Sequence, residues 1–151
     1  MSPSFRFRLE RVRAVRERKE KLAQRELADA LSRRSTSVAE LRSADAEVEH
    51  ARAEQRTAVA EAGAVSATEL MAHQAFLERT EMQRRERADE LARHDDEVAE
   101  RDAELAVAAG EHEMLNRLRE RRRREHDREV ARRELNVLDE ITASRFRGSS
   151  A

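Results

Sequence analysis

The chain has 151 residues, the size of one domain, and 42% of them are charged. Its three glycines, one proline and four phenylalanines are too few for the turns and core of a compact fold with many elements. The net charge is only −1 and the apolar residues are regularly spaced, which argues against disorder of the whole chain. This composition is typical of long helices and coiled coils.

The sequence also excludes several classes of protein. It contains no cysteine, so it predicts no disulfide framework and fits a reducing compartment. The first residues contain no apolar run and no cleavage site of a signal peptide, and no stretch approaches the roughly 20 apolar residues of a membrane span. We therefore expect a soluble cytoplasmic protein.

Phenylalanine and arginine alternate at the N-terminus, from Phe5 to Arg8. This pattern fits either a short extended lead-in or a first helical turn with its two aromatic residues on different faces. From Leu9 on, the apolar residues follow helical spacing. We expect the first helix to cover about residues 5–62.

Signals for the end of one helix and the start of another meet near the middle of the chain. Gly63 suits a left-handed residue just past a helix C-terminus. Ser66 and Glu69 have the spacing of a capping box, in which each side chain accepts a hydrogen bond from the other residue's backbone N–H. The sequence predicts a bend at 63–66, a second helix over about 66–146 and a frayed tail at 147–151, all in one coiled-coil domain.

Both predicted helices carry a heptad seam, which runs from Leu27 to Ala62 in the first and from Ala67 to Leu105 in the second. In a tight hairpin, residue i lies opposite about residue 129 − i. This register places Asp45 opposite Arg84 and Arg34 opposite Asp95, and two opposite-charge matches inside a seam favour one specific pairing. The predicted fold is therefore all-α, a long antiparallel two-helix coiled-coil hairpin.

The second helix is longer than the first, so we expect it to overhang. The overhang, about residues 125–147, is more apolar than most of the seam, and an exposed apolar stripe generally marks a binding partner. Charge is uneven as well: the net charge is +6 over residues 1–34, −11 over 35–116 and +4 over 117–151. A hairpin brings the two basic segments together at one end.

No catalytic, cofactor-binding or metal-binding constellation is visible. The five histidines are never three or four residues apart, so no pair on one helix face can hold a metal ion. The arginine-rich run 119–128 fits a salt-bridged helix surface better than a nucleic-acid site, because it has no interleaved aromatic residues. We expect no enzyme activity, cofactor, nucleic acid or small-molecule substrate.

Three stretches of the chain stand out as short motifs. The first is Phe5-Arg-Phe-Arg-Leu-Glu-Arg-Val12 with the segments 16–20 and 23–28. The second is Gly63–Ser66 with Leu70 and the segment 75–77. The third is the segment 132–140 with Arg145-Phe-Arg147. In their order and spacing, over nearly the full length, these stretches resemble the FliJ family of flagellar export proteins.

The resemblance implies an antiparallel coiled coil that acts as a stalk in the hexameric ATPase ring of the flagellar type III export apparatus. Such a protein also touches the membrane export gate and helps recycle export chaperones. Its expected place is the cytoplasm, peripherally associated with the inner-membrane export apparatus, and in isolation we expect a monomer. The alternatives are the equivalent stalk protein of a virulence-type secretion system and a free-standing coiled-coil scaffold that dimerises through residues 130–146.

The resemblance also implies two sets of binding residues. The helix ends would enter the ATPase ring, through Phe5, Phe7, Leu9, Val12, Leu135, Leu138, Ile141 and Phe146. The region near the bend would face the export gate or the chaperones, through Leu70, Phe76 and Leu77.

Overall fold

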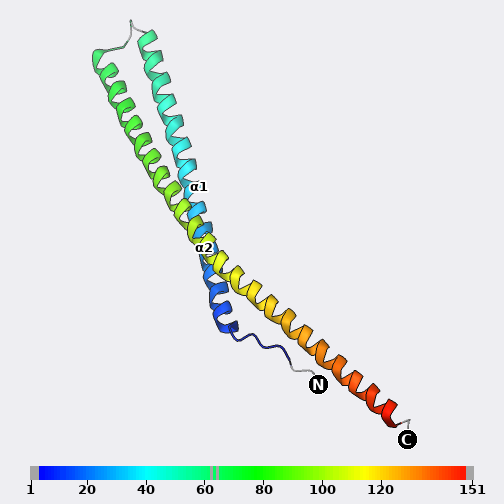
Figure 1. Cartoon of the computed structure of the whole chain (residues 1–151). Coiled ribbons are helices and arrows are strands. Elements are labelled where there is room, and N and C mark those ends of the chain that lie inside the picture. The colour runs from blue at the N-terminus through cyan, green and yellow to red at the C-terminus, as the bar shows by residue number, and fades with distance from the viewer. Residues whose placement is uncertain (1–3, 62, 64, 149–151) are drawn as a thin grey trace. The chain divides into compact units, whose positions relative to one another are not determined.

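The computed structural model describes residues 4–61, 63 and 65–148. These residues form two α-helices, α1 (Glu10–Ala60) and α2 (Ala67–Gly148), and contain no strand. The two helices pack against each other, which confirms the predicted all-α hairpin. In Figure 1 the cyan part of α1 and the green part of α2 run side by side from the bend.

The contacts between the helices divide the chain into two compact units. Unit 1 comprises Met1–Lys21 and Ala106–Ala151, and unit 2 comprises Leu22–Leu105. Each unit therefore combines a segment of α1 with a segment of α2. That the whole chain folds as one domain stays a prediction.

Helix α1 begins at Glu10, later than the expected start near residue 5. The preceding residues are not helical, and the N–H of Glu10 donates to the carbonyl of Phe7 at 3.2 Å in a turn. Phe5 and Phe7 are half-buried, whereas Arg6 and Arg8 are exposed. An extended segment puts alternate side chains on one side, whereas a helix would put the two phenylalanines about 200° apart. Burial of both rings therefore favours the extended lead-in.

The bend connects Ala60 to Ala67, and two of its residues, 62 and 64, lie outside the described part of the chain. Gly63 is in a turn but does not have a positive φ, so the expected left-handed residue is absent there. On the other side of the bend, the N–H of Ser66 donates to Oε2 of Glu69 at 2.8 Å, and the N–H of Glu69 donates to Oγ of Ser66 at 3.2 Å. This reciprocal capping box starts α2.

The most buried residues of α1 in unit 2 form a column of small side chains. They recur every seven residues, a heptad spacing, and only one further residue, Val48, is as deeply buried. The column consists of Ala23, Ala30, Ser37, Ala44, Ala51 and Ala58. Such small side chains let the two helices approach closely.

The expected heptad seam of α1 consists of two columns of residues, and the structure shows that one of them was wrong. The column that includes Leu41 and Val48 faces α2, but Leu31 and Val59 are 46% and 56% exposed. Ala30 and Ala58, one residue earlier, are 1% and 8% exposed. Alanine adds little to a hydrophobic pattern, so the larger residues beside it dominated the periodicity. In α2 the buried residue is Thr80, again one residue before the predicted position.

Candidate binding surfaces

Unit 2 contains a ladder of polar contacts between the helices. Arg84 Nε donates to Asp45 Oδ1 at 2.5 Å, and Arg34 donates to Asp95 in the same way. Gln55 Nε2 donates to Gln74 Oε1 at 2.8 Å. All three pairs belong to the 129 − i register. The charged residues lie beside the alanine column, at the half-exposed edges of the interface, where water still reaches them.

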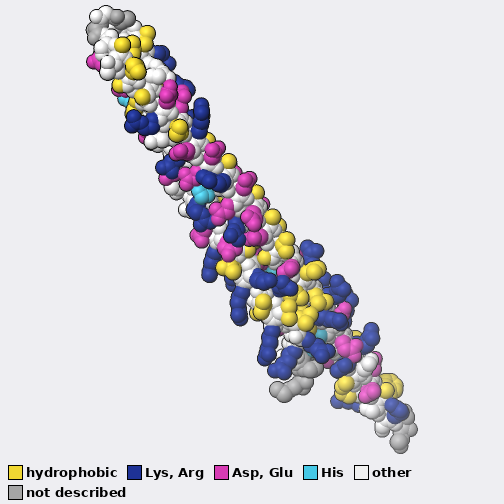
Figure 2. All heavy atoms as spheres, turned by 90° about the vertical axis from the view of Figure 1, so that its left-hand side faces the viewer, with side chains coloured by type: hydrophobic (Ala, Val, Ile, Leu, Met, Phe, Trp, Pro, Cys, Tyr) yellow, Lys and Arg dark blue, Asp and Glu magenta, His cyan; other side chains and the backbone are white. Residues whose placement is uncertain are grey.

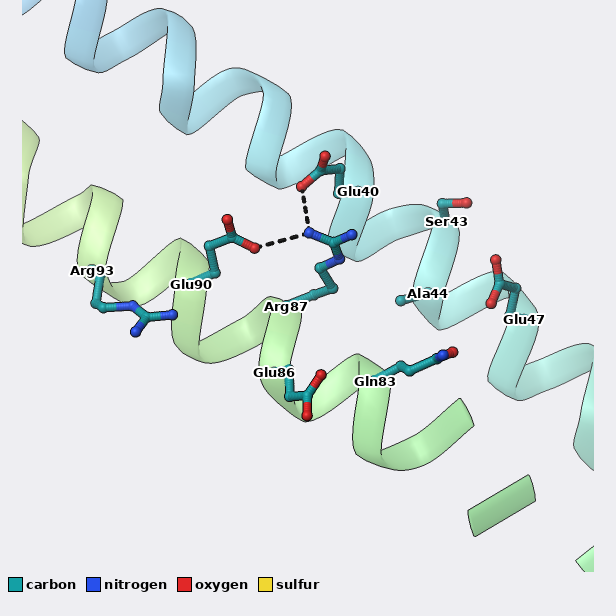
Figure 3. A pocket seen from close by; sticks show the side chains of 9 residues that line it. All are labelled: Glu40, Ser43, Ala44, Glu47, Gln83, Glu86, Arg87, Glu90 and Arg93. Atoms are coloured by element: carbon teal, nitrogen blue, oxygen red, sulfur yellow. Dashed lines mark hydrogen bonds and ion pairs between the residues drawn. The ribbon is translucent and has the colours of Figure 1, made fainter. Parts of the chain in front are cut away.

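Arg87 shows how the long side chains of α2 cross the small column of α1. One guanidinium nitrogen, Nη1, donates at 3.0 Å both to Glu40 of α1 and to Glu90 of α2 (Figure 3). The two carboxylates raise the pKa of Arg87 above its ordinary value, with Glu90 as the larger cause. Ala44 lines the same hollow, where its small side chain leaves room. Arg52 and Arg101 likewise each pair with one carboxylate on their own helix and one across the interface.

In unit 1 the interface between the helices is largely polar. Arg16 donates to Glu111 at 2.5 Å, and the half-buried His112 contacts Glu20 through Nδ1. Asn116 lies 3.2 Å from the other ring nitrogen of His112. The two valines of α1 in this unit are only partly covered, since Val12 and Val15 are 44% and 51% exposed. The heptad pattern did not reveal this polar interface.

The structure brings together three of the four N-terminal members of the predicted ATPase-binding set, and the fourth, Val12, is 44% exposed outside that group. Phe5 packs on α2 with its ring 5.6 Å from that of His126, tilted by 58°. Phe5, Phe7 and Leu9 line one hollow together with Leu118 of α2. A second hollow, of about 570 Å³, is lined by Phe5 and by residues of α2 from Arg119 to Glu134. The N-terminal segment therefore covers part of α2.

The C-terminal members of that set lie on an open helix surface. Every residue from 131 to 148 is exposed, including Leu135 at 62%, Leu138 at 59% and Phe146 at 78%. At 100° per residue, the apolar side chains of this segment cover about half of the helix circumference. We call this surface the apolar half-face: Val130, Ala131, Leu135, Val137, Leu138, Ile141 and Phe146. In Figure 2 apolar side chains (yellow) lie in the open near this end of α2.

The residues predicted to contact the export gate or chaperones do not form one patch. Leu77 is half-buried on the side of α2 that faces α1, and Leu70, one heptad earlier, is 37% exposed. Phe76 is 40% exposed and projects about 100° away from Leu77. Sequence reasoning passed over Met71 and Met82, which are 73% and 62% exposed. Each of these methionines could have been recognised in the sequence as a large apolar residue that lies outside the heptad seam.

Several arginines of the run 119–128 form ion pairs. Arg124 pairs with Glu120, Arg122 with Glu125, and Arg119 reaches Glu10 of α1 at 3.7 Å. In the described part of the chain, no three histidine or acidic residues are grouped so that they could hold a metal ion. None of the described helices has a segment long and apolar enough to cross a membrane.

The family model described as "Flagellar FliJ protein" matches residues 5–151. No curated protein and no solved structure matches the chain.

Proposed function

The chain belongs to the FliJ family of flagellar export-associated proteins, and from this premise we propose that it is a non-catalytic, stalk-like subunit of the flagellar type III export apparatus. It binds the export ATPase ring and couples the ring to the membrane export gate and the export chaperones. The family is non-enzymatic, so the chain acts by binding, at the cytoplasmic side of the export apparatus.

The apolar half-face carries this proposal. An amphipathic helix normally buries a stripe of this width against other elements, yet here every described residue after 130 is exposed. A surface of this kind fits a concave socket formed by another protein. In the proposed assembly, the ring of ATPase subunits provides this socket.

The N-terminal residues have a second role in this proposal. Phe5 and Phe7 hold the lead-in against α2, so they shape the base of the overhang and do not themselves project into the socket. Leu135, Leu138 and Ile141 make the apolar contacts with the ring. Near the bend, Phe76 and Leu70 supply exposed surface for the gate or the chaperones.

The test combines this chain with the ATPase subunit of the same export apparatus. We expect the two to co-purify and the ATPase to hydrolyse ATP faster when the chain is present. Leu138→Asp and Ile141→Asp should weaken both effects at least tenfold, because a charged side chain would have to enter an apolar socket. Asn136→Asp, on the opposite side of the same helix, is the matched control and should leave both unchanged. No stimulation at saturating concentrations of the chain would refute the stalk role.

A virulence-type secretion system contains an equivalent stalk protein, and the same half-face would serve it. Pairing the chain in turn with the flagellar and the virulence-type ATPase separates the two systems. A free-standing scaffold would instead leave both ATPases unaffected.

A further inference from the structure

We propose that the free chain forms a weak antiparallel homodimer, in which the C-terminal parts of two α2 helices cover each other's apolar half-faces. The occupant of this surface is a second copy of the chain. The inference rests on the exposure of the half-face in unit 1 and is independent of the ATPase proposal. It replaces the expectation that the chain is a monomer in isolation.

The first argument is that one chain cannot cover this surface itself. The half-face and the 570 Å³ hollow beside Phe5 lie on the same continuous helix, α2. The hollow is centred near residue 127 and the half-face near residue 138, about 16 Å further along the helix axis. Val130 and Ala131 belong to both surfaces. Because a straight helix cannot fold back over that distance, Leu135 and Leu138 of one copy reach only the hollow of another.

The second argument is the apolar character of that hollow. Phe5, Val130 and Ala131 contribute apolar surface, and the aliphatic stem of Arg123 adds to it. Leucine side chains from a second copy, such as Leu135 and Leu138, fit there. Since the hollow and the half-face are both present in each copy, a two-fold axis lets each copy cover the other, and the assembly closes as a dimer.

The third argument is charge complementarity between two segments of the helix. Residues 117–128 contain seven arginines and three carboxylates, whereas residues 134–144 contain three carboxylates and no basic residue. Arg121, Arg123, Arg128 and Asp139 form no ion pair within the described part of the chain. A parallel dimer would place the arginine-rich segments side by side. An antiparallel dimer places each of them opposite the acidic segment of the other copy.

These constraints fix an approximate geometry. The two-fold axis passes near residue 131, so residue i of one copy lies opposite about residue 262 − i of the other. Leu135 then lies opposite Asp127 at the hollow, and Asp139 lies opposite Arg123. The interface is short and partly charged, so the dimer is weak and exchanges readily. Because it hides the half-face, a partner that binds the half-face competes with the second copy.

Cysteine cross-linking tests the geometry, since the chain contains no cysteine of its own. Ala131→Cys lies near the proposed axis and should form a disulfide-linked dimer under mild oxidation. Thr142→Cys lies on the same side of the helix, but its two copies would be about 33 Å apart and should not cross-link. Asn136→Cys lies on the opposite side of the helix and should not cross-link either. Efficient linking of Thr142→Cys would indicate a parallel dimer and overturn the proposal.

The second test measures the weight-average mass of the unmodified chain by sedimentation. We expect its weight-average mass to rise toward twice the monomer mass over two decades of micromolar concentration. Leu138→Asp should abolish this rise, whereas Asn136→Asp should keep it. A mass that stays monomeric at every concentration, with no cross-link at residue 131, refutes the dimer. Neither experiment contains the ATPase. The dimer proposal can therefore be refuted while the stalk proposal stands, and the stalk proposal can be refuted while the dimer proposal stands.

Discussion

The guanidinium of Arg84 donates to the carboxylate of Asp45 at 2.5 Å across the interface of unit 2, where both side chains are about half exposed. Half-exposed pairs contribute little energy, but they fix the register, because sliding either helix by one position separates the charges. The pair is therefore more important for specificity than for stability.

Charge reversal tests this pair. Asp45→Arg should destabilise the hairpin by about 1 kcal/mol, since it replaces attraction by repulsion. Arg84→Asp in the same chain should restore part of the loss. Urea unfolding followed by circular dichroism measures both, as the chain contains no tryptophan. Strictly additive effects of the two changes would mean that the side chains do not interact.

A second prediction compares the effect on stability of substitutions in the alanine column and in the column of larger residues beside it. Ala30 is 1% exposed, so Ala30→Leu should push the helices apart and cost about 1–3 kcal/mol. Its neighbour Leu31 is 46% exposed, and Leu31→Ala should cost less than about 1 kcal/mol. The free energies of unfolding of the two variants give the comparison. The reverse order would show that the seam passes through Leu31.

The capping box makes the stability of the start of α2 depend on pH. The backbone N–H of Ser66, and next its hydroxyl, lower the pKa of Glu69 below its ordinary value of 4.5. A carboxyl whose pKa is lower in the folded than in the unfolded chain stabilises the fold above its unfolded pKa. This contribution is lost as the pH falls through the folded pKa.

Glu69→Gln should therefore lower the melting temperature at pH 7, and the difference from the unmodified chain should shrink as the pH falls below 4.5. Glu61→Gln, on the other side of the bend and outside the capping box, is the control. Thermal melts at half-unit pH steps measure the effect. A difference that stays constant down to acidic pH would contradict the role of the Glu69 carboxylate.

The N-terminal lead-in provides a fourth prediction. Its ring contact between Phe5 and His126 is worth about 0.5–1.5 kcal/mol in addition to the buried area. Phe5→Ala should therefore release the segment and speed tryptic cleavage after Arg8 several-fold. Phe146→Ala, at the other end of unit 1, should leave that cleavage rate unchanged. Equal rates in the two variants would mean that Phe5 does not hold the lead-in.

The sequence by itself determined the two long helices, the position of the bend and two of the charged pairs between the helices of unit 2, Asp45–Arg84 and Arg34–Asp95. It did not reveal the others, such as Arg33–Glu97 and Arg87–Glu40. The features that it determined depend on local and pairwise properties: helical periodicity, the spacing of Ser66 and Glu69, and opposite charges at matching heights such as Asp45 and Arg84. The family resemblance also followed from the order of short motifs along the chain.

Only the tertiary structure decided which helix faces are covered. Two neighbouring columns, through Ala30 and through Leu31, differ by only 100° around α1, and the hydrophobic pattern favoured the larger residue. Packing favoured the smaller one, because a methyl side chain lets the second helix approach and lets long side chains such as Arg87 pass over it. In the same way, the extended lead-in depends on contacts of Phe5 with a residue 121 positions away, which no local pattern contains.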